Sequence, residues 1–291
     1  MLLQQIVNGL LLGGVYVLVA VAFSICWGFL NFVNFSIPAL FSLGGFCIWV
    51  FMQYGIGWWP SALLAVVLAA AVSCIVERFT FRFQRNAGPV VPLVSSLGFL
   101  ILIENVLLAL YGSEGRAVQL PLQDVNWRID GLVISLPQLG GLLLAILLVA
   151  GFSVALKTSK LGRGVRAIAE SPDTAVLLGV RINSLVPLVF LLAGVFSGLA
   201  GVLFALGYQQ VSPFIGDQVA LKGLSAMVLG GMGSIWGAVL GGLVIGIVEV
   251  LAIRFWSADF VKIAVYGVLL LLLIIKPSGL LGNGQTRQEK F

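Results

Sequence analysis

Histidine is absent from this chain, and charged residues make up only 9% of its 291 positions. The absence of histidine removes the commonest general base, pH switch and metal ligand of proteins together. A soluble domain carries about a quarter charged residues, so a chain this poor in charge cannot cover its surface in water. Hydrophobic residues make up 60% of the sequence and the mean hydropathy is +1.13. These values predict an all-α polytopic bundle of membrane helices, forming a single transmembrane domain over residues 1–291.

Cysteine pairs and nucleotide-binding motifs are also missing. The three cysteines, Cys26, Cys47 and Cys74, lie far apart inside apolar runs without a C-x-x-C motif, which indicates small buried side chains rather than disulfides or metal ligands. The sequence contains no G-x-x-x-x-G-K-[ST] phosphate loop and no G-x-S-x-G motif. We therefore expect that the chain has no ATPase site of its own and binds neither a cofactor nor a metal ion.

The net charge of +5 does not indicate a nucleic-acid partner. Basic residues lie in short segments between apolar runs, as expected when Lys and Arg hold cytoplasmic loops in place beside a lipid bilayer. The first residues, MLLQQIVNGLLLGG, include no basic n-region and no cleavage site after a short apolar core. They predict a first transmembrane helix that stays in the protein rather than a removable signal peptide.

Eight apolar runs are long enough, or nearly so, to cross the hydrocarbon core, which takes about 20 residues. They cover residues 5–29, 33–53, 59–77, 90–111, 136–156, 184–208, 235–255 and 261–276. A shorter apolar stretch, 219–229, leads into the glycine-rich turn LGGMGS and predicts a re-entrant or broken helix near 219–234. Such backbone is tolerated at membrane depth only where protein or a water-filled cavity surrounds it.

Loop charges predict the orientation. Two basic loops carry Arg78, Arg82 and Arg85 and, further along, Lys157, Lys160, Arg163, Arg166 and Arg181. The loop 112–135 mixes acidic with basic residues. The basic loops should face the cytoplasm and the mixed loop the outside, which puts the N-terminus outside and, if the stretch 219–229 behaves as a crossing, the C-terminus inside.

Many of the 36 glycines lie four residues apart, on one face of a helix. The pairs are Gly9 and Gly13, Gly194 and Gly198, Gly237 and Gly241, and Gly242 and Gly246. Small residues at this spacing let helices approach closely in a membrane, so helix packing is the favoured interpretation. The run Gly230–Ser234 differs, because consecutive small residues break a helix and leave backbone groups free.

The long basic loop 157–183 has the pattern of two short helices. Arg166 and Glu170 are one helical turn apart, and Ser171, Pro172 and Asp173 supply an N-cap, a first-turn proline and an acidic first turn for a second helix. Gly179 can end that helix in a left-handed conformation.

This loop also carries apolar residues that would be poorly placed in water, namely Ala167, Ile168, Val176 and Leu177. A solvated, positively charged loop is the plainer interpretation. The apolar face favours a helical knob that docks on a partner.

The stretch GRGVRAIAESPDTAVLLGV resembles the coupling-helix segment of the branched-chain amino acid permease family of bacterial ATP-binding-cassette importers. The positions that match the family pattern are Gly162, Arg163, Arg166, Ala167, Pro172, Ala175 and Gly179. Further similarity lies in NGLLLGGVYVLVAVAFSICWGFLNFVNFS, in FLLAGVFSGLAGVLFA, and in the G-G-x-G-S and G-A-x-x-G-G elements after residue 211. The resemblance covers nearly the whole chain.

The resemblance implies an importer in the bacterial inner membrane with several partners. It implies two ATP-binding-cassette ATPase subunits that use the ATP, a second and related permease subunit, and an external, periplasmic solute-binding protein. The residues that would couple to the ATPase are those of the matching pattern together with Glu170 and Asp173.

One stretch departs from the family pattern. Family members commonly carry asparagine, phenylalanine, alanine, histidine and glycine after the first span, where this chain has Asn31-Phe32-Val33-Asn34-Phe35-Ser36. Because this region would lie near the translocation path, the departure bears on the substrate and not on the fold.

Polar residues inside apolar runs are candidates for that path, because ionisable groups in spans are costly and usually functional. The candidates are Asn8, Asn31, Asn34, Glu104, Asn105, Gly230, Gly231, Gly233 and Ser234. Plain helix caps and local hydrogen bonds are the alternatives for the asparagines and for Glu104. Glu249 is expected near an interface in a structural role. Lys222, close to Asp217, is expected near the outer surface, snorkelling toward water.

Branched-chain or other amino acids are the expected solutes, with urea, amides or small carboxylates as the alternatives. An ion-coupled secondary transporter is the main rival class. It would call for several intramembrane ionisable groups and inverted repeats, whereas the sequence offers one plainly central carboxylate, Glu104, and no evident repeat.

Overall fold

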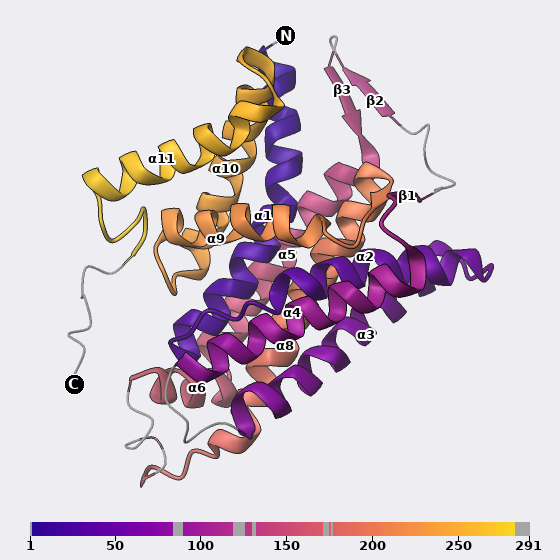
Figure 1. Ribbon diagram of the computed structural model, residues 1–291. Coiled ribbons are helices and arrows are strands. Elements are labelled where there is room, and N and C mark those ends of the chain that lie inside the picture. The colour runs from indigo at the N-terminus through magenta and orange to yellow at the C-terminus, as the bar shows by residue number, and fades with distance from the viewer. Residues whose placement is uncertain are drawn as a thin grey trace.

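The computed structural model describes residues 2–83, 90–118, 126–129, 132–170, 175 and 177–282 (Figure 1). Helices dominate these ranges: α1 (Leu2–Leu30), α2 (Ile37–Gln53), α3 (Trp58–Glu77), α4 (Val90–Tyr111), α5 (Leu136–Thr158), α6 (Lys160–Glu170), α8 (Ile182–Tyr208), α9 (Ile215–Gly230), α10 (Ile235–Phe255) and α11 (Val261–Ile275). A π-helical turn, Arg78–Arg82, continues α3, and a 3-10 turn, Ala258–Phe260, precedes α11. Four short strands, β1 (Arg116–Ala117), β2 (Asn126–Ile129), β3 (Leu132–Ser135) and β4 (Gln210–Val211), form two antiparallel pairs, β1 with β4 and β2 with β3.

The predicted helical bundle is confirmed. Each of the eight apolar runs coincides with a helix, and seven helices of the described residues are long and apolar enough to cross a membrane. The remaining run forms α2, which has only 17 residues. The short stretch before the glycine turn forms α9, which starts at Ile215, four residues earlier than predicted, and ends where Gly231 adopts a positive φ of 108°.

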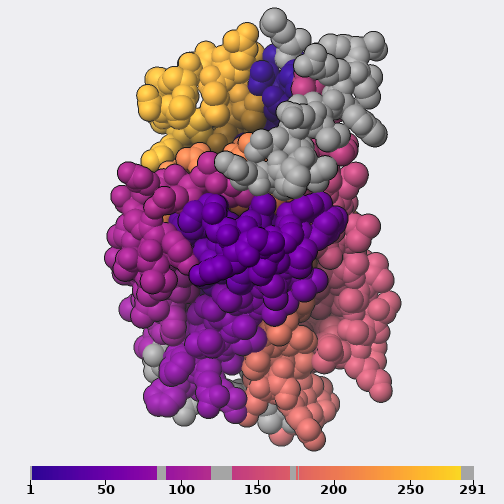
Figure 2. Space-filling view, turned by 90° about the vertical axis from the view of Figure 1, so that its right-hand side faces the viewer, coloured from indigo at the N-terminus to yellow at the C-terminus, as the bar shows by residue number. Residues whose placement is uncertain are grey.

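Helices α1 and α8 form the centre of the molecule. The middle of α1 is buried from Leu11 to Cys26, against α8, α9, α10 and α5. The spans formed by the outer helices α4, α5 and α11 are only 22%, 17% and 11% buried, as expected of surfaces that meet lipid. In Figure 2, α2, α3 and α4, indigo to magenta, cover one face, with α5 in pink beside them.

Close contacts at glycine hold the helices together. A Cβ atom at Gly9 of α1 would lie 2.7 Å from the Cα of Ile247 in α10, and one at Gly44 of α2 would lie 2.8 Å from the Cα of Gly198 in α8. Gly242 and Gly246 lie against the α1 backbone in the same way, and Gly237 and Gly241 against the end of α9. The glycine pairs predicted for helix packing therefore do pack helices.

An internal repeat, which was not evident in the sequence, becomes visible in the backbone. Two non-glycine residues in the described ranges have a positive φ, Asn31 at 55° and Gln209 at 56°, and they end α1 and α8. In both places the chain makes a short turn before the next helix begins, at Ile37 and at Ile215. Neither helix start has a side-chain cap, and the amides of Ile37 and Ile215 donate hydrogen bonds to the carbonyl groups of Asn34 and Ser212, three residues back. Asn31 and Gln209 are 178 positions apart, as are Ile37 and Ile215.

The packing follows the same repeat. Helix α1 packs along α10 as α8 packs along α3, and α9 packs on α1 as α2 packs on α8. The two units, α1–α4 and α8–α11, run in opposite directions. Helix α1 starts beside β3, where Gln4 Nε2 donates to the Val133 carbonyl, and runs to the end of the molecule where α6 lies. Helix α8 starts beside α6 and ends at β4. The repeat is not evident in the sequence because the two copies share helix packing and not residues.

The basic segments gather at one end of the molecule. The π-turn Arg78–Arg82, α6 and the start of α8 lie together at the lower end in Figure 1. The start of α1 and the β2–β3 hairpin lie at the opposite end (Figure 1). The alternation of loops predicted from charge is thus reproduced by the fold.

We expect Gly44→Ala to destabilise the protein by about 1–3 kcal/mol, because the new methyl group would collide with the α8 backbone and force the helices apart. Gly98→Ala in α4 is the matched control, since nothing lies within 4 Å of a Cβ at Gly98. Thermal unfolding of the detergent-solubilised variants, followed by size-exclusion chromatography, compares the two. Equal melting temperatures would contradict the packing role of Gly44.

Candidate translocation and coupling sites

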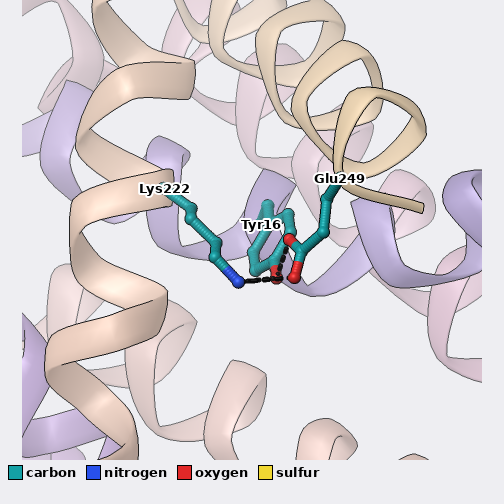
Figure 3. A network of polar contacts seen from close by, with 3 residues as sticks. All are labelled: Tyr16, Lys222 and Glu249. Carbon is teal, nitrogen blue, oxygen red and sulfur yellow. Dashed lines mark hydrogen bonds and ion pairs between the residues drawn. The ribbon is translucent and has the colours of Figure 1, made fainter. Parts of the chain in front are cut away.

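Three polar side chains from three helices meet inside the bundle (Figure 3). Tyr16 of α1 donates a hydrogen bond to Glu249 Oε2 of α10 at 2.6 Å. Lys222 of α9 forms an ion pair with Glu249 Oε1 at 2.5 Å and donates to the Tyr16 hydroxyl at 3.1 Å. Both carboxylate oxygens of Glu249 are therefore used, and the ammonium of Lys222 lies 5.4 Å from the centre of the Tyr16 ring. We call these three residues the polar triad.

The polar triad lies deep in the bundle. Tyr16 is 14 residues from either end of α1, or about 21 Å along the axis, and only 1% exposed. The side chains of Lys222 and Glu249 are 19% and 10% exposed. Two expectations need correction here: Lys222 does not snorkel to the surface, because its ammonium is held by Glu249, and Glu249 is a buried partner of an ion pair.

Glu104 is another buried carboxylate of the spans. It is 6% exposed on α4, and its Oε1 has no hydrogen-bond partner among the described residues. Its carboxyl group interacts with that of Asp217, in the first turn of α9. The neighbouring candidate Asn105 points away, since it is exposed and donates to the Ile101 carbonyl of its own helix at 2.8 Å.

The three asparagine candidates have local partners. Asn8 accepts a hydrogen bond from Gln4 on the same helix. Asn31 is exposed and ends α1 in a left-handed conformation, as caps do. Asn34 is fully buried, and its Oδ1 accepts hydrogen bonds from the amide and the hydroxyl of Ser36, which orders the turn before α2. These contacts favour the capping alternative, although a role in the path stays a prediction.

The glycine turn between α9 and α10 is closed by the chain itself. The carbonyl groups of Leu229 and Gly230, at the end of α9, accept hydrogen bonds from the amides of Leu280 and Leu281 at 2.9 Å each. A Cβ atom at Gly231 would lie 2.6 Å from the Cα of Gly282. These two carbonyl groups are not free, so the end of α9 does not offer them as the unpaired acceptors expected from the sequence.

The other side of the same turn is equally occupied. Gly233 has a φ of 82° and lies against Gly28 near the end of α1. The Ser234 hydroxyl accepts a hydrogen bond from the Gly237 amide and caps α10. The turn thus joins α1, α9, α10 and the segment after α11.

The predicted coupling loop starts with α6, an amphipathic helix bound tightly to the bundle. Gly162 lies so close to the backbone of Leu156 in α5 that a Cβ atom would be 2.7 Å from its Cα. Arg166 Nη1 donates to the Leu156 carbonyl at 2.6 Å, and Arg163 Nη1 donates to the Thr158 carbonyl at 3.3 Å. Glycine and arginine at these positions therefore fix the angle between α5 and α6.

The apolar residues of the loop divide into two groups. Val165 and Ile168 are buried in the main core, Ala175 is buried and Ala167 packs partly against the core. Leu177 and Leu178 are 86% and 74% exposed, beside Gly179 with its φ of 80°. The expectation that Ala167 and Ile168 need an external partner is wrong, because the bundle covers them, whereas Leu177 does point outward. Glu170 is exposed at the end of α6, and Pro172, Asp173 and Val176 lie outside the described residues.

Tyr16 is the member of the polar triad that the sequence did not single out. It is one tyrosine within a long apolar run, where a phenol is an ordinary packing residue. The only hint is that a buried tyrosine hydroxyl needs a partner, and nothing in the sequence says that this partner is 233 positions away.

Comparison with known proteins gives matches over nearly the whole chain. Residues 5–275 match the family described as branched-chain amino acid transport system / permease component. The chain is 30% identical to the high-affinity branched-chain amino acid transport system permease protein BraD of Pseudomonas aeruginosa, over 98% of this chain and 97% of that protein. It is 31% identical to the corresponding permease protein LivH of Escherichia coli, with the same coverage. No solved structure matches the chain.

We expect Leu280→Pro to destabilise the protein by about 1–3 kcal/mol, because proline has no amide hydrogen and would leave the buried carbonyl of Leu229 without its donor. Leu280→Ala keeps the amide and should cost less. Melting temperatures of the purified variants compare the two. A Leu280→Ala loss as large as that of Leu280→Pro would show that the side chain, and not the hydrogen bond, matters.

Proposed function

Because this chain belongs to the family of permease components of branched-chain amino acid transport systems, we propose that it forms part of an ATP-driven import path for branched-chain amino acids. The chain is a multi-pass membrane permease and carries no nucleotide-binding motif. In the proposed complex two ATPase subunits hydrolyse ATP, a second, related permease subunit completes the path, and an external binding protein delivers the solute.

The observation that carries this proposal is the construction of α6 and the residues after it. The helix is joined rigidly to α5 through Gly162 and Arg166, and its buried face packs against α1 and α8. A force applied to α6 would therefore act on the two central helices without first being absorbed by a flexible loop. This is the mechanical property that a connection between a separate ATPase and the spans requires.

Leu177 and Leu178 supply the proposed contact with the ATPase. They are the most exposed apolar side chains of this loop among the described residues, and they lie at the basic end of the molecule, where lipid does not cover them. An apolar pocket on the ATPase would remove both from water.

The basic end is proposed to face the cytoplasm and the start of α1 the outside. Arg78, Arg82, Arg163 and Arg166 lie at the basic end, and such residues are retained on the cytoplasmic side of bacterial inner membranes. This orientation puts α6 and Leu177 on the side where ATP is available.

We expect the double variant Leu177→Ser/Leu178→Ser to lower transport by at least tenfold, because it removes the apolar contact with the ATPase. Leu2→Ser/Leu3→Ser is the matched control, since these two leucines are also exposed, 59% each, at the opposite end. Co-purification of the ATPase subunits and uptake of labelled leucine by intact cells measure the effect. Wild-type ATPase recovery in the Leu177/Leu178 variant would refute the docking assignment.

Orientation is tested with single cysteines in a chain whose three native cysteines are replaced by alanine. Ser113 and Ser184 are exposed at opposite ends of the molecule. Ser113→Cys should react with a membrane-impermeant thiol reagent in intact spheroplasts. Ser184→Cys should react only after permeabilisation, and the reverse pattern would invert the proposed topology.

A further inference from the structure

The polar triad has a counterpart position in the other half of the inverted repeat, and the residues that meet there are small and uncharged. Helices α1, α9 and α10 correspond to α8, α2 and α3. Where the second group meets, a Cβ atom at Gly194 would lie 2.5 Å from the Cβ of Ser73, and one at Gly198 would lie 2.5 Å from the Cβ of Ala69. Gly44 of α2 lies against Gly198 as well. The same junction of three helices is thus closed by small residues and backbone contacts.

This comparison shows that the architecture does not require charges at the junction. A buried ion pair is weak support for stability, because both ions lose their water and the pair only partly recovers that loss. Ionisable groups deep in a membrane protein are usually functional. The half that carries Lys222 and Glu249 keeps close contacts (a Cβ atom at Gly223 would lie 2.5 Å from Val19) and adds an ion pair that the other half does without.

We propose that Lys222, Glu249 and Tyr16 bind the zwitterionic head group of a transported amino acid, an inference that rests on the proposed function. The α-ammonium group of the solute would take the place of Lys222 on the Glu249 carboxylate. The α-carboxylate group would take the place of Glu249 on the Lys222 ammonium and the Tyr16 hydroxyl. The two contacts of Glu249, with Lys222 and with Tyr16, are exchanged for three contacts to the solute, and the net charge of the site stays zero.

The charge balance selects among the candidate solutes. A zwitterion leaves both Lys222 and Glu249 paired. A small carboxylate would pair Lys222 and leave Glu249 as a buried, unpaired anion, which is strongly unfavourable. Urea or an amide brings no charge to replace either partner, so the internal ion pair stays closed. The polar triad therefore favours amino acids over the other solute classes that the sequence left open.

The location suits a transient contact. The Lys222 and Glu249 side chains keep 19% and 10% of their surface exposed, so the ion pair is not sealed completely inside the bundle. Lys222 is seven residues from the start of α9, near the middle of a helix whose far end is fixed by Leu280 and Leu281. Opening the ion pair would loosen α9 from α1 and α10 at the position where the solute binds.

The test uses the complete transporter, with both permease subunits and the ATPases, in proteoliposomes. The binding protein and labelled leucine are added together on the side of the membrane that corresponds to the outside of the cell. The double variant Lys222→Gln/Glu249→Gln replaces the ion pair with two amides of similar size that can still bond to each other. We expect leucine uptake to fall at least tenfold while binding-protein-stimulated ATP hydrolysis stays within twofold of wild type. Ser73→Ala, at the counterpart junction, is the matched control and should keep uptake within twofold.

Tyr16→Phe keeps the ion pair and removes one donor for the carboxylate, so uptake should fall about threefold to tenfold with ATP hydrolysis unchanged. Uptake within twofold of wild type in the double amide variant overturns the proposal and leaves the polar triad as a structural contact. If that variant does not assemble, Tyr16→Phe decides, and unchanged uptake again overturns the proposal. Failure of the proposed function itself is recognised separately, since the wild-type complex would then take up no leucine at all.

Discussion

Close approach of helix backbones is the interaction on which this structure depends. Lipid gives helices no hydrophobic reason to associate, so they are held by van der Waals contact and by the polar groups that close packing brings together. The contacts of Gly9 and Gly246 between α1 and α10, and of Gly44 and Gly198 between α2 and α8, provide that packing. Because these helices touch along their backbones, side chains from distant parts of the chain reach one another in the interior.

The inverted repeat makes the packing of the two halves similar, and the residues at the two central junctions make the halves different. Both halves turn after a left-handed residue, Asn31 or Gln209, and both start the next helix six positions later. One half closes the central junction with Gly194 and Ser73, whereas the other places Lys222 and Glu249 there. Because the same helix arrangement forms with small residues or with an ion pair at the junction, one junction can be purely structural and the other can be a polar site.

The two proposed sites are joined through the central helices. Helix α6 is bound to α5 and packs on α1 and α8, and α1 carries Tyr16 to the polar triad. The far end of α9, which carries Lys222, is fixed by hydrogen bonds from the segment after α11. A movement of α6 at the basic end would therefore reach the polar triad through α6 and α1. Transport driven by a separate ATPase requires such a connection.

The sequence by itself determined the membrane class, the eight apolar runs and the helical loop at the basic end. Run length, charge and glycine spacing are local properties, and they decide directly which segments partition into lipid and which stay in water. The resemblance carried by Gly162, Arg163 and Arg166 identified the family as well. Only the tertiary structure decided what the polar residues do. It paired Lys222 with Glu249 and Tyr16, covered Ile168, exposed Leu177 and filled the acceptors of the glycine turn from Leu280 and Leu281. The physical reason is that Tyr16 and Glu249 are 233 positions apart, and the burial and partners of such groups depend on how whole helices pack, which no local pattern records.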